Sequence, residues 1–175
     1  MNKEDVEKAQ KGDKKAFEKI IMEVIDSLYR VAYGILENQE DASDAISNAT
    51  LKAYEKIKTL RQAEFFKTWI TKILINECNA IIRQKKNLIY LENYKENQED
   101  IYTKNSERTL DVKQAMEKLN KEQKQIVILY YFDDLSTETI AEMLEIPKGT
   151  VKSRLSKARQ VLAKELIKGY KEDIG

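Results

Sequence analysis

The sequence contains no histidine, one cysteine (Cys78) and one proline (Pro147) among its 175 residues. A single cysteine excludes a disulfide within the chain, and the lack of histidine removes the commonest ligand of a metal site. Glycine-rich phosphate loops are missing too, as are pairings of histidine with serine or cysteine that could form a nucleophilic centre. We therefore expect no enzyme activity, no metal, no other cofactor and no small-molecule substrate.

Long apolar runs are also missing. The most apolar stretches, Ile73–Ile75 and Ile126–Leu129, are far shorter than the roughly 20 residues that span a bilayer. The charged N-terminus lacks the apolar core of a signal peptide. Together with the single cysteine, these absences predict a soluble protein of the reducing cytoplasm.

What is present is helical periodicity along nearly the whole sequence. After a break at Gly12–Asp13, where glycine suits a helix end and aspartate suits a cap, apolar residues recur every three or four positions up to Ile35. Residues 38–40 are expected to form a loop, and a second helix with a mostly alanine inner face is expected to start near Asp41. A third helix follows a turn at residues 59–63. These three helices are expected to bury one core over residues 14–86.

The pattern ends between residues 87 and 108, where the stretch Glu92–Asp100 is polar and net acidic, and it returns from Thr109. We expect an all-α protein made of two small helical domains, residues 1–86 and 109–175, joined by a flexible linker over 87–108. Fully extended, such a linker reaches roughly 70 Å at about 3.3 Å per residue. That span is about two turns of B-DNA, so the domains could dock at separate places on one duplex.

The sharpest local pattern runs from Leu135 to Leu155 and predicts two helices joined by a tight turn. Ser136 is a good N-cap for the first helix, Ile146 is expected to fill the corner, and Pro147 is well placed to open the second helix. The predicted inner faces consist of Ile140, Ala141 and Leu144 in the first helix, and Val151, Leu155 and Ala158 in the second. This arrangement is a helix-turn-helix.

Charge is nearly balanced over the chain, with 31 Lys and Arg against 30 Asp and Glu, but it is not evenly distributed. From Lys148 to Lys164 the second helix carries six basic residues and no acid, whereas the first helix carries Glu138 and Glu142. A helical hairpin with a solvated basic face is the alternative interpretation. The combination of cap, small residue, apolar corner and acid-free helix favours DNA binding.

The C-terminal pattern closely resembles region four of the extracytoplasmic-function (ECF) sigma factors, minimal bacterial sigma factors with only region-two and region-four domains. The matching residues are Leu129–Ser136, Ile140–Ala141, Gly149–Leu155 and Ala158–Arg159. The sequence departs at Thr139, where the family usually has Glu completing a capping box, and at Glu145, usually Gly. The resemblance implies that the second helix reads the −35 promoter element in the major groove. The implied contact residues are Lys148, Gly149, Thr150, Lys152, Ser153, Arg154, Ser156, Lys157 and Arg159.

The N-terminal domain resembles region two through Gly12–Asp13, Ala16–Phe17 and Asp41–Asp44. In the family, the helix that starts at this last motif binds the clamp helices of the polymerase β′ subunit. The implied polymerase contacts are Asp41, Ala42, Asp44, Ala45, Asn48, Leu51 and Tyr54. Ser43, Ser47 and Thr50 replace the usual Glu, Gln and Phe. For Asp41 and Asp44, stabilisation of a helix N-terminus alone is an equally good interpretation.

The third helix resembles the promoter-reading helix of the family through Thr68–Ile70, Asn76 and Arg83. Independently of that resemblance, its amides and cations repeat at spacings of three and four and form one polar stripe. The residues implied to contact the −10 element are Arg61, Phe65, Lys72, Asn76, Asn79, Arg83 and Lys86. Trp69 is expected as a core anchor rather than a base-stacking residue. For Asn79, a solvated amide is as good an interpretation as a contact.

The resemblance implies an alternative sigma factor that binds core RNA polymerase at the β′ clamp helices and the β flap and directs initiation at promoter DNA in a stress or envelope response. It also implies control by an anti-sigma factor, often a membrane protein in the family, which would hold this cytoplasmic protein at the membrane. An autonomous helix-turn-helix regulator is the main alternative, and it would bind its DNA site without polymerase. A structural helical adaptor is disfavoured by the acid-free second helix.

Overall fold

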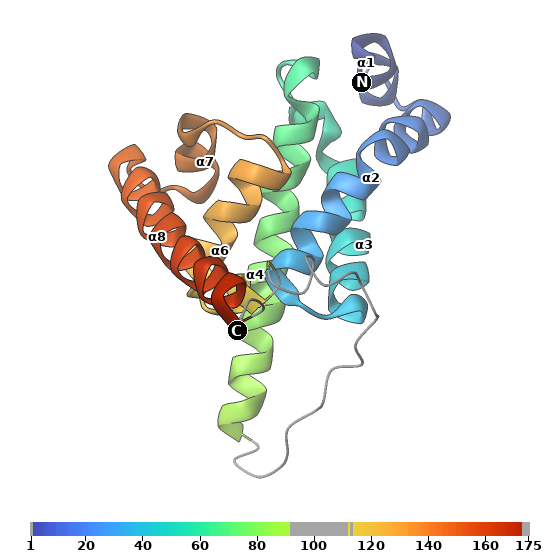
Figure 1. Ribbon diagram of the computed structural model, residues 1–175. Coiled ribbons are helices and arrows are strands. Elements are labelled where there is room, and N and C mark those ends of the chain that lie inside the picture. The colour runs from blue at the N-terminus through green and yellow to red at the C-terminus, as the bar shows by residue number, and fades with distance from the viewer. Residues whose placement is uncertain (1, 92–111, 113, 173–175) are drawn as a thin grey trace. The chain divides into compact units, whose positions relative to one another are not determined.

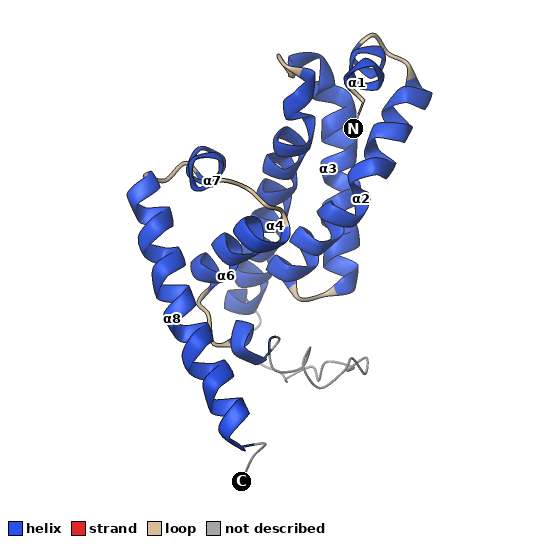
Figure 2. Cartoon of the chain, turned by 45° about the horizontal axis from the view of Figure 1, so that its top comes forward, coloured by secondary structure: helices blue, strands red, loops and turns tan. Residues whose placement is uncertain are grey.

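The computed structural model describes residues 2–91, 112 and 114–172 (Figure 1). Every described element is a helix, as Figure 2 shows, so the expectation of an all-α fold is confirmed. The chain divides into two compact units, residues 1–88 and 89–175. Each unit is described by itself below.

Unit 1 begins with α1 (Lys3–Gln10) and α2 (Lys14–Leu36), joined by a tight connection. The predicted punctuation is confirmed: Gly12 has φ 98°, a conformation in which glycine is favoured, and the carboxylate of Asp13 accepts hydrogen bonds from the backbone N–H groups of Lys15 (2.9 Å) and Ala16 (3.1 Å). Asp13 therefore begins a helix that continues past Gly34 to Leu36.

The next helix, α3 (Gln39–Lys56), starts two residues earlier than expected. The Asn38 side chain accepts a hydrogen bond from the backbone N–H of Asp41 (2.9 Å) and is the N-cap, so of the predicted loop at residues 38–40 only Asn38 is non-helical, and the prediction is wrong for Gln39 and Glu40. Asparagine is among the best N-cap residues, and glutamine and glutamate propagate a helix readily. The alanine inner face is confirmed, because it is fully buried where α3 packs on α2; its members are Ala42, Ala45, Ala49 and Ala53.

Two short 3-10 helices, η1 (Ile57–Thr59) and η2 (Ala63–Phe65), lead into α4 (Phe66–Leu91). Three side chains of α4 are fully buried and complete the core: Phe66, Ile70 and Leu74. The helix extends to Leu91, so residues 87–91, assigned to the linker from the sequence, are helical. The remainder of that predicted linker, residues 92–108, lies outside the described residues.

The core of unit 1 also includes α1, which the three-helix expectation left out. Val6 is fully buried, and the Gln10 amide donates hydrogen bonds to the backbone carbonyls of Ile57 (3.3 Å) and Leu60 (2.6 Å). Lys19 of α2 donates to the largely buried carboxylate of Asp5 at 2.6 Å. The first helix therefore fixes the η1 and η2 segment that precedes α4.

Unit 2 contains α6 (Lys121–Val127), a π-helical turn η3 (Ile128–Phe132), α7 (Thr137–Leu144) and α8 (Lys148–Glu172), after helical residues at 114–117. Both α6 and α7 pack on α8. The fully buried centre consists of Ile126, Leu129, Ile140, Val151 and Ala158. In α7, Met143 is buried and Leu144 only half-buried, which corrects the inner face expected from the sequence.

Candidate nucleic-acid interface

The two helices α7 and α8 form the predicted helix-turn-helix. Ser136 caps α7, since its Oγ accepts a hydrogen bond from the backbone N–H of Thr139 at 3.0 Å. At the other end of α7, Glu145 adopts a left-handed conformation with φ 56°, and the backbone N–H of Ile146 returns to the Ala141 carbonyl (3.1 Å). The Pro147 carbonyl then accepts the first hydrogen bonds of α8. The cap and the opening role of proline are confirmed.

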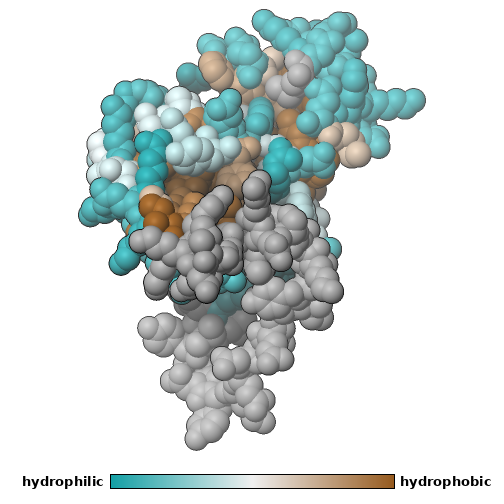
Figure 3. Space-filling view, viewed as in Figure 1, coloured by the Kyte–Doolittle hydropathy of each residue, from teal (hydrophilic) through white to brown (hydrophobic). Residues whose placement is uncertain are grey.

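One face of α8 is buried against the rest of unit 2 and the opposite face is exposed. Val151, Leu155 and Ala158 form the buried face, as expected from the sequence. Seven residues predicted to contact DNA are exposed: Lys148, Gly149, Lys152, Ser153, Ser156, Lys157 and Arg159. Lys148 and Arg159 bind side chains of unit 2, and we call the other five the outward face of α8. The part of α7 and α8 in view at the left of Figure 3 is mainly hydrophilic.

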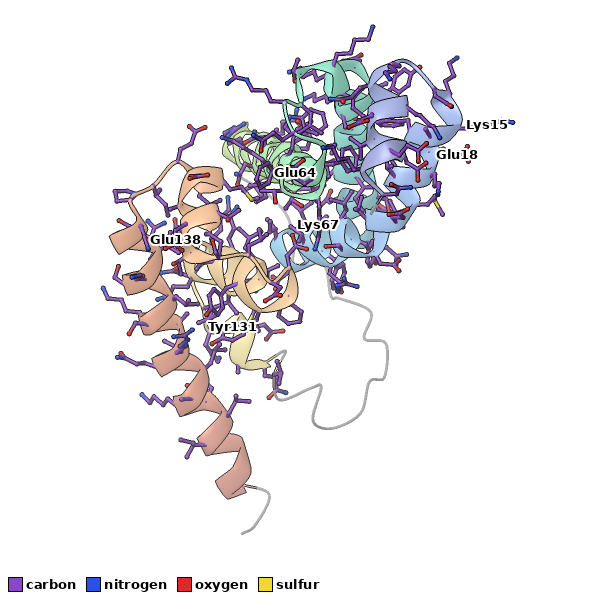
Figure 4. All side chains as sticks on the ribbon, turned by 90° about the horizontal axis from the view of Figure 1, so that it is seen from above. Lys15, Glu18, Glu64, Lys67, Tyr131 and Glu138 are labelled. Carbon is purple, nitrogen blue, oxygen red and sulfur yellow. The ribbon has the colours of Figure 1, made fainter. Side chains whose placement is uncertain are left out.

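The other four residues predicted to contact the −35 element have partners within the protein or are partly covered. Lys148 forms an ion pair across the turn with Glu138, which is labelled in Figure 4. The Thr150 carbonyl accepts a hydrogen bond from the Ser153 hydroxyl (3.0 Å), and Arg154 is half-buried. Arg159 is exposed, one residue after the buried Ala158, and its guanidinium is bound by tyrosine.

The guanidinium of Arg159 is held by two neighbouring tyrosines of η3. Its Nε donates a hydrogen bond to the Tyr131 hydroxyl at 2.8 Å, and this bond, with further contributions from Tyr131 and Tyr130, raises the pKa of Arg159 above its ordinary value. Tyr131 was not identified from the sequence as a functional residue. The two residues are 28 positions apart, and no helical spacing connects them.

The polar stripe of α4 is partly exposed. Asn76 and Arg83 are exposed, Lys72 and Asn79 are half-buried, and the side chain of Lys86 lies outside the described residues. The segment before α4 exposes two further predicted residues, Arg61 and Phe65, and the Phe65 side chain is 55% exposed. An exposed aromatic ring can stack on nucleic-acid bases, and exposed amides and cations in the same unit can contact base edges and phosphates.

Trp69 is neither a fully buried core anchor nor a fully exposed ring that is free to stack on a base. Its side chain is half-buried, with the ring centroid 6.0 Å from that of Phe66. The indole therefore packs on the core of unit 1 from its edge. It is not the fully buried anchor expected from the sequence.

The exposed face of α3 contains only part of the set predicted to bind polymerase. Ala42 and Ala45 are fully buried against α2, so their side chains cannot form a surface contact. The prediction that they bind polymerase is therefore wrong, and their small size instead lets α3 pack closely on α2. The carboxylate of Asp41 forms an ion pair with Lys85 of α4, with 2.5 Å between Oδ2 and Nζ. The exposed members are Asp44, Asn48, Leu51 (59% exposed) and Tyr54 (41% exposed).

Neither a metal site nor a membrane span is found in the described part of the chain. No group of three or more histidine, cysteine, aspartate or glutamate side chains there could hold a metal ion. None of the described helices combines the length and the apolar character needed to cross a membrane.

Comparison with known proteins gives consistent matches for both units. Residues 20–87 match the family model for sigma-70 region 2, and residues 109–162 match that for sigma-70 region 4. The chain is 31% identical to the ECF RNA polymerase sigma factor SigW of Bacillus subtilis, with 95% of this chain and 97% of that protein covered. It is also 31% identical to the RNA polymerase sigma factor SigV of the same organism, with 80% and 84% covered.

Solved structures give the same result. The sigma factor RpoE of Bartonella quintana, crystallised with the anti-sigma factor NepR, superposes with a TM-score of 0.77 at 26% identity, with 88% of this chain and 98% of that chain covered. CnrH, in complex with the cytosolic domain of CnrY, superposes with a TM-score of 0.71 at 17% identity, covering 94% and 96%. This second match supports the fold alone.

Proposed function

The chain belongs to the ECF sigma factors of the sigma-70 family, and on that premise we propose how its surfaces divide the work of promoter recognition. As a member of this family it is an alternative sigma factor that directs transcription initiation at specific promoters, and sigma factors are initiation factors and not catalysts. A role in a stress or envelope response fits the family. The finer assignments below rest on the exposed surfaces of the two units.

We assign recognition of the −35 element to α8. The observation that carries this assignment is its outward face, where Lys152, Lys157 and two serine hydroxyls project opposite a fully buried apolar face. A helix of this kind presents cations to phosphates and hydroxyls to base edges in the major groove. If Lys152 and Lys157 each bind one phosphate, they contribute about −1.8 to the slope of log K against log [salt], at ~0.9 per phosphate.

Unit 1 is assigned to the −10 element and to polymerase. The exposed residues Arg61, Phe65, Asn76 and Arg83 would engage the −10 DNA, with the Phe65 ring available for stacking on an unpaired base. On α3, Asp44, Asn48, Leu51 and Tyr54 would contact the β′ clamp helices, and unit 2 would contact the β flap. Leu51 supports the polymerase assignment, because a large exposed apolar side chain among polar residues suits a protein interface.

An anti-sigma factor is proposed as the regulatory partner. The solved sigma factor RpoE, which shares this fold, was crystallised with the anti-sigma factor NepR bound to it. The proposed location of this chain is the cytoplasm, with retention at the membrane when the anti-sigma partner is a membrane protein.

Transcription in vitro by core polymerase on a library of random promoters tests the function directly. With this protein we expect start sites preceded by two shared sequence boxes at a fixed spacing, and none of these start sites with core polymerase alone. If core polymerase is indifferent and the protein alone retains one DNA site on a filter, it is an autonomous regulator and the assignments in unit 1 are wrong.

Substitution of matched lysines tests the assignment of α8. Lys157→Ala should weaken promoter binding by the holoenzyme and reduce the magnitude of the salt slope by about 0.9, because the variant binds one phosphate fewer. Lys118→Ala is the control, since Lys118 is also exposed in unit 2 but does not belong to α8. Equal effects of the two substitutions would contradict the assignment.

A further inference from the structure

Arg159 has surroundings unlike those of the lysines on the outward face of α8. Its Nε donates to the Tyr131 hydroxyl at 2.8 Å, and the guanidinium carbon lies 5.4 Å from the ring centroid of Tyr130 and 5.7 Å from that of Tyr131. Distances of this size are typical of cation–π contacts, which a flat guanidinium makes well. The group therefore has one directional hydrogen bond and two aromatic neighbours within its own unit.

The π-helical turn η3 supplies both tyrosines. The backbone N–H of Asp133 returns to the Ile128 carbonyl (3.2 Å) across the wide turn, and that of Leu135 returns to Leu129 (3.0 Å). The Tyr130 and Tyr131 rings meet edge to face, with centroids 5.0 Å apart and planes at 79°. Figure 4 shows Tyr131 between α6 and α8. π-helical turns are rare in proteins, and η3 forms the C-terminal end of the helix that α6 begins.

The position of Arg159 on α8 agrees with this arrangement. Arg159 directly follows the fully buried Ala158, four residues after the buried Leu155, and so lies at the edge of the packed face. Arg159 is itself exposed and lies about two turns after Lys152 on the same side of α8, so its bond to Tyr131, not its burial, distinguishes it from the lysines. A guanidinium hydrogen-bonded to Tyr131 is therefore directed along the protein surface toward η3.

We propose that Arg159 is a positioning residue that fixes α8 against η3, with Tyr131 as its specific partner, and that it does not contact promoter phosphates. This inference rests on the proposed role of α8 in reading DNA. By holding the edge of α8, the pair keeps the outward face at a set angle to α7 and to the turn. The planar guanidinium is essential to this role, because a lysine ammonium has neither the Nε donor nor the flat surface that lies over the rings.

The two roles predict different salt dependence in holoenzyme binding to a promoter selected from the random library. If Arg159 bound a phosphate, the lysine charge in Arg159→Lys would largely preserve that bond, and Arg159→Ala would reduce the slope magnitude by about 0.9. For a positioning residue, both substitutions should weaken binding, by about three- to tenfold, with little change in slope. Lys157→Ala serves as the matched reference for a residue that binds a phosphate.

Tyr131→Phe completes the test because it removes only the hydroxyl of a side chain that is 54% exposed, so the fold should be retained. We expect it to weaken binding as Arg159→Lys does, and the double variant to be no weaker than the stronger single variant, because both break the same interaction. The same coupling should appear in thermal unfolding of the full chain without DNA. Wild-type binding by Tyr131→Phe, together with a slope reduced by about 0.9 in Arg159→Ala, would overturn the proposal.

Failure of the underlying function gives a different pattern. If Lys157→Ala leaves affinity and slope unchanged, the assignment of α8 to DNA is wrong. Coupling between Arg159 and Tyr131 in unfolding would then still establish their interaction, but its role in promoter reading would be rejected.

Discussion

Among the residues that the structure describes, three that are not glycine have a left-handed backbone: Glu37, Asp134 and Glu145, with φ of 54°, 54° and 56°. This conformation brings Cβ close to the backbone and costs an ordinary residue roughly 1–2 kcal/mol. Glu37 and Glu145 occupy the C-terminal ends of α2 and α7, where glycine is the usual solution. The chain therefore carries local backbone strain at two helix ends, and ECF sigma factors usually have glycine at the second.

Replacement of Glu145 by glycine should stabilise unit 2. We expect Glu145→Gly to raise the free energy of unfolding by about 0.5–1 kcal/mol, since relief of the left-handed strain outweighs the added entropy of the unfolded chain. Urea unfolding followed by circular dichroism measures this change. Glu142→Gly, at an exposed position inside α7, is the control and should lower the free energy of unfolding by about 1 kcal/mol. A loss of stability in both variants would show that strain at Glu145 is negligible.

At Gly149 a substitution should affect promoter binding without lowering stability. A Cβ added there meets no atom within 4 Å, so nothing inside the protein requires glycine. Gly149→Ala should leave the free energy of unfolding unchanged or raise it by up to about 1 kcal/mol, because alanine favours a helix. It should nevertheless weaken promoter binding, since a methyl group would separate the start of α8 from the DNA backbone. Titration of the holoenzyme with promoter DNA, beside urea unfolding, measures both; unchanged affinity would mean that DNA does not approach Gly149 closely.

At the scale of elements, α1 connects the N-terminus to the segment that presents Phe65. The Gln10 amide donates hydrogen bonds to two backbone carbonyls of that segment, and the Val6 side chain is fully buried in the core of unit 1. The unsatisfied carbonyls left by removal of the Gln10 amide would each carry a desolvation cost. A helix of eight residues that would be marginal in isolation is thus an integral part of unit 1.

Truncation of Val6 tests this role of α1. Val6→Ala should lower the free energy of unfolding of unit 1 by about 2 kcal/mol, because it opens a cavity in a fully buried position. The single tryptophan, Trp69, lies in unit 1 and reports its unfolding by fluorescence. Met22→Ala is the control: Met22 is 65% exposed on α2, and its truncation should change the free energy by less than about 0.5 kcal/mol. Equal effects would place α1 outside the cooperative core.

At the scale of the whole molecule, two separate units bind two separate promoter elements in the proposed function. Energetic effects of substitutions in distant, independent sites usually add within about 0.3–0.5 kcal/mol. Asn76 belongs to unit 1 and Lys152 to unit 2, and both side chains are exposed. Their contributions to promoter affinity should therefore be independent.

A double-variant cycle measures that independence. The losses of binding free energy in Asn76→Ala and Lys152→Ala should sum to the loss in the double variant within about 0.5 kcal/mol, as read from holoenzyme titrations on the selected promoter. Arg159→Ala with Tyr131→Phe is the contrasting pair within one unit and should be strongly non-additive. A coupling above about 1 kcal/mol between Asn76 and Lys152 would reject independent binding by the two units.

The amino-acid sequence by itself determined the features that depend on residues a few positions apart. Asp13 and Ser136 cap their helices, Pro147 opens α8, and the three-and-four spacing along α8 separates its buried face from its outward face. A cap or a helical face needs only the local backbone and a side chain within one turn. The family resemblance, carried by the same local patterns, indicated the function.

Only the tertiary structure decided which of the marked residues are available to a partner. Ala42 and Ala45 of the predicted polymerase surface are buried, and Asp41 forms an ion pair with Lys85. The helix α1 belongs to the core of unit 1, and Arg159 is hydrogen-bonded to Tyr131. The Asp41–Lys85 and Arg159–Tyr131 interactions join residues 44 and 28 positions apart. Such interactions depend on how helices pack and on where each side chain then points, which no short-range spacing encodes.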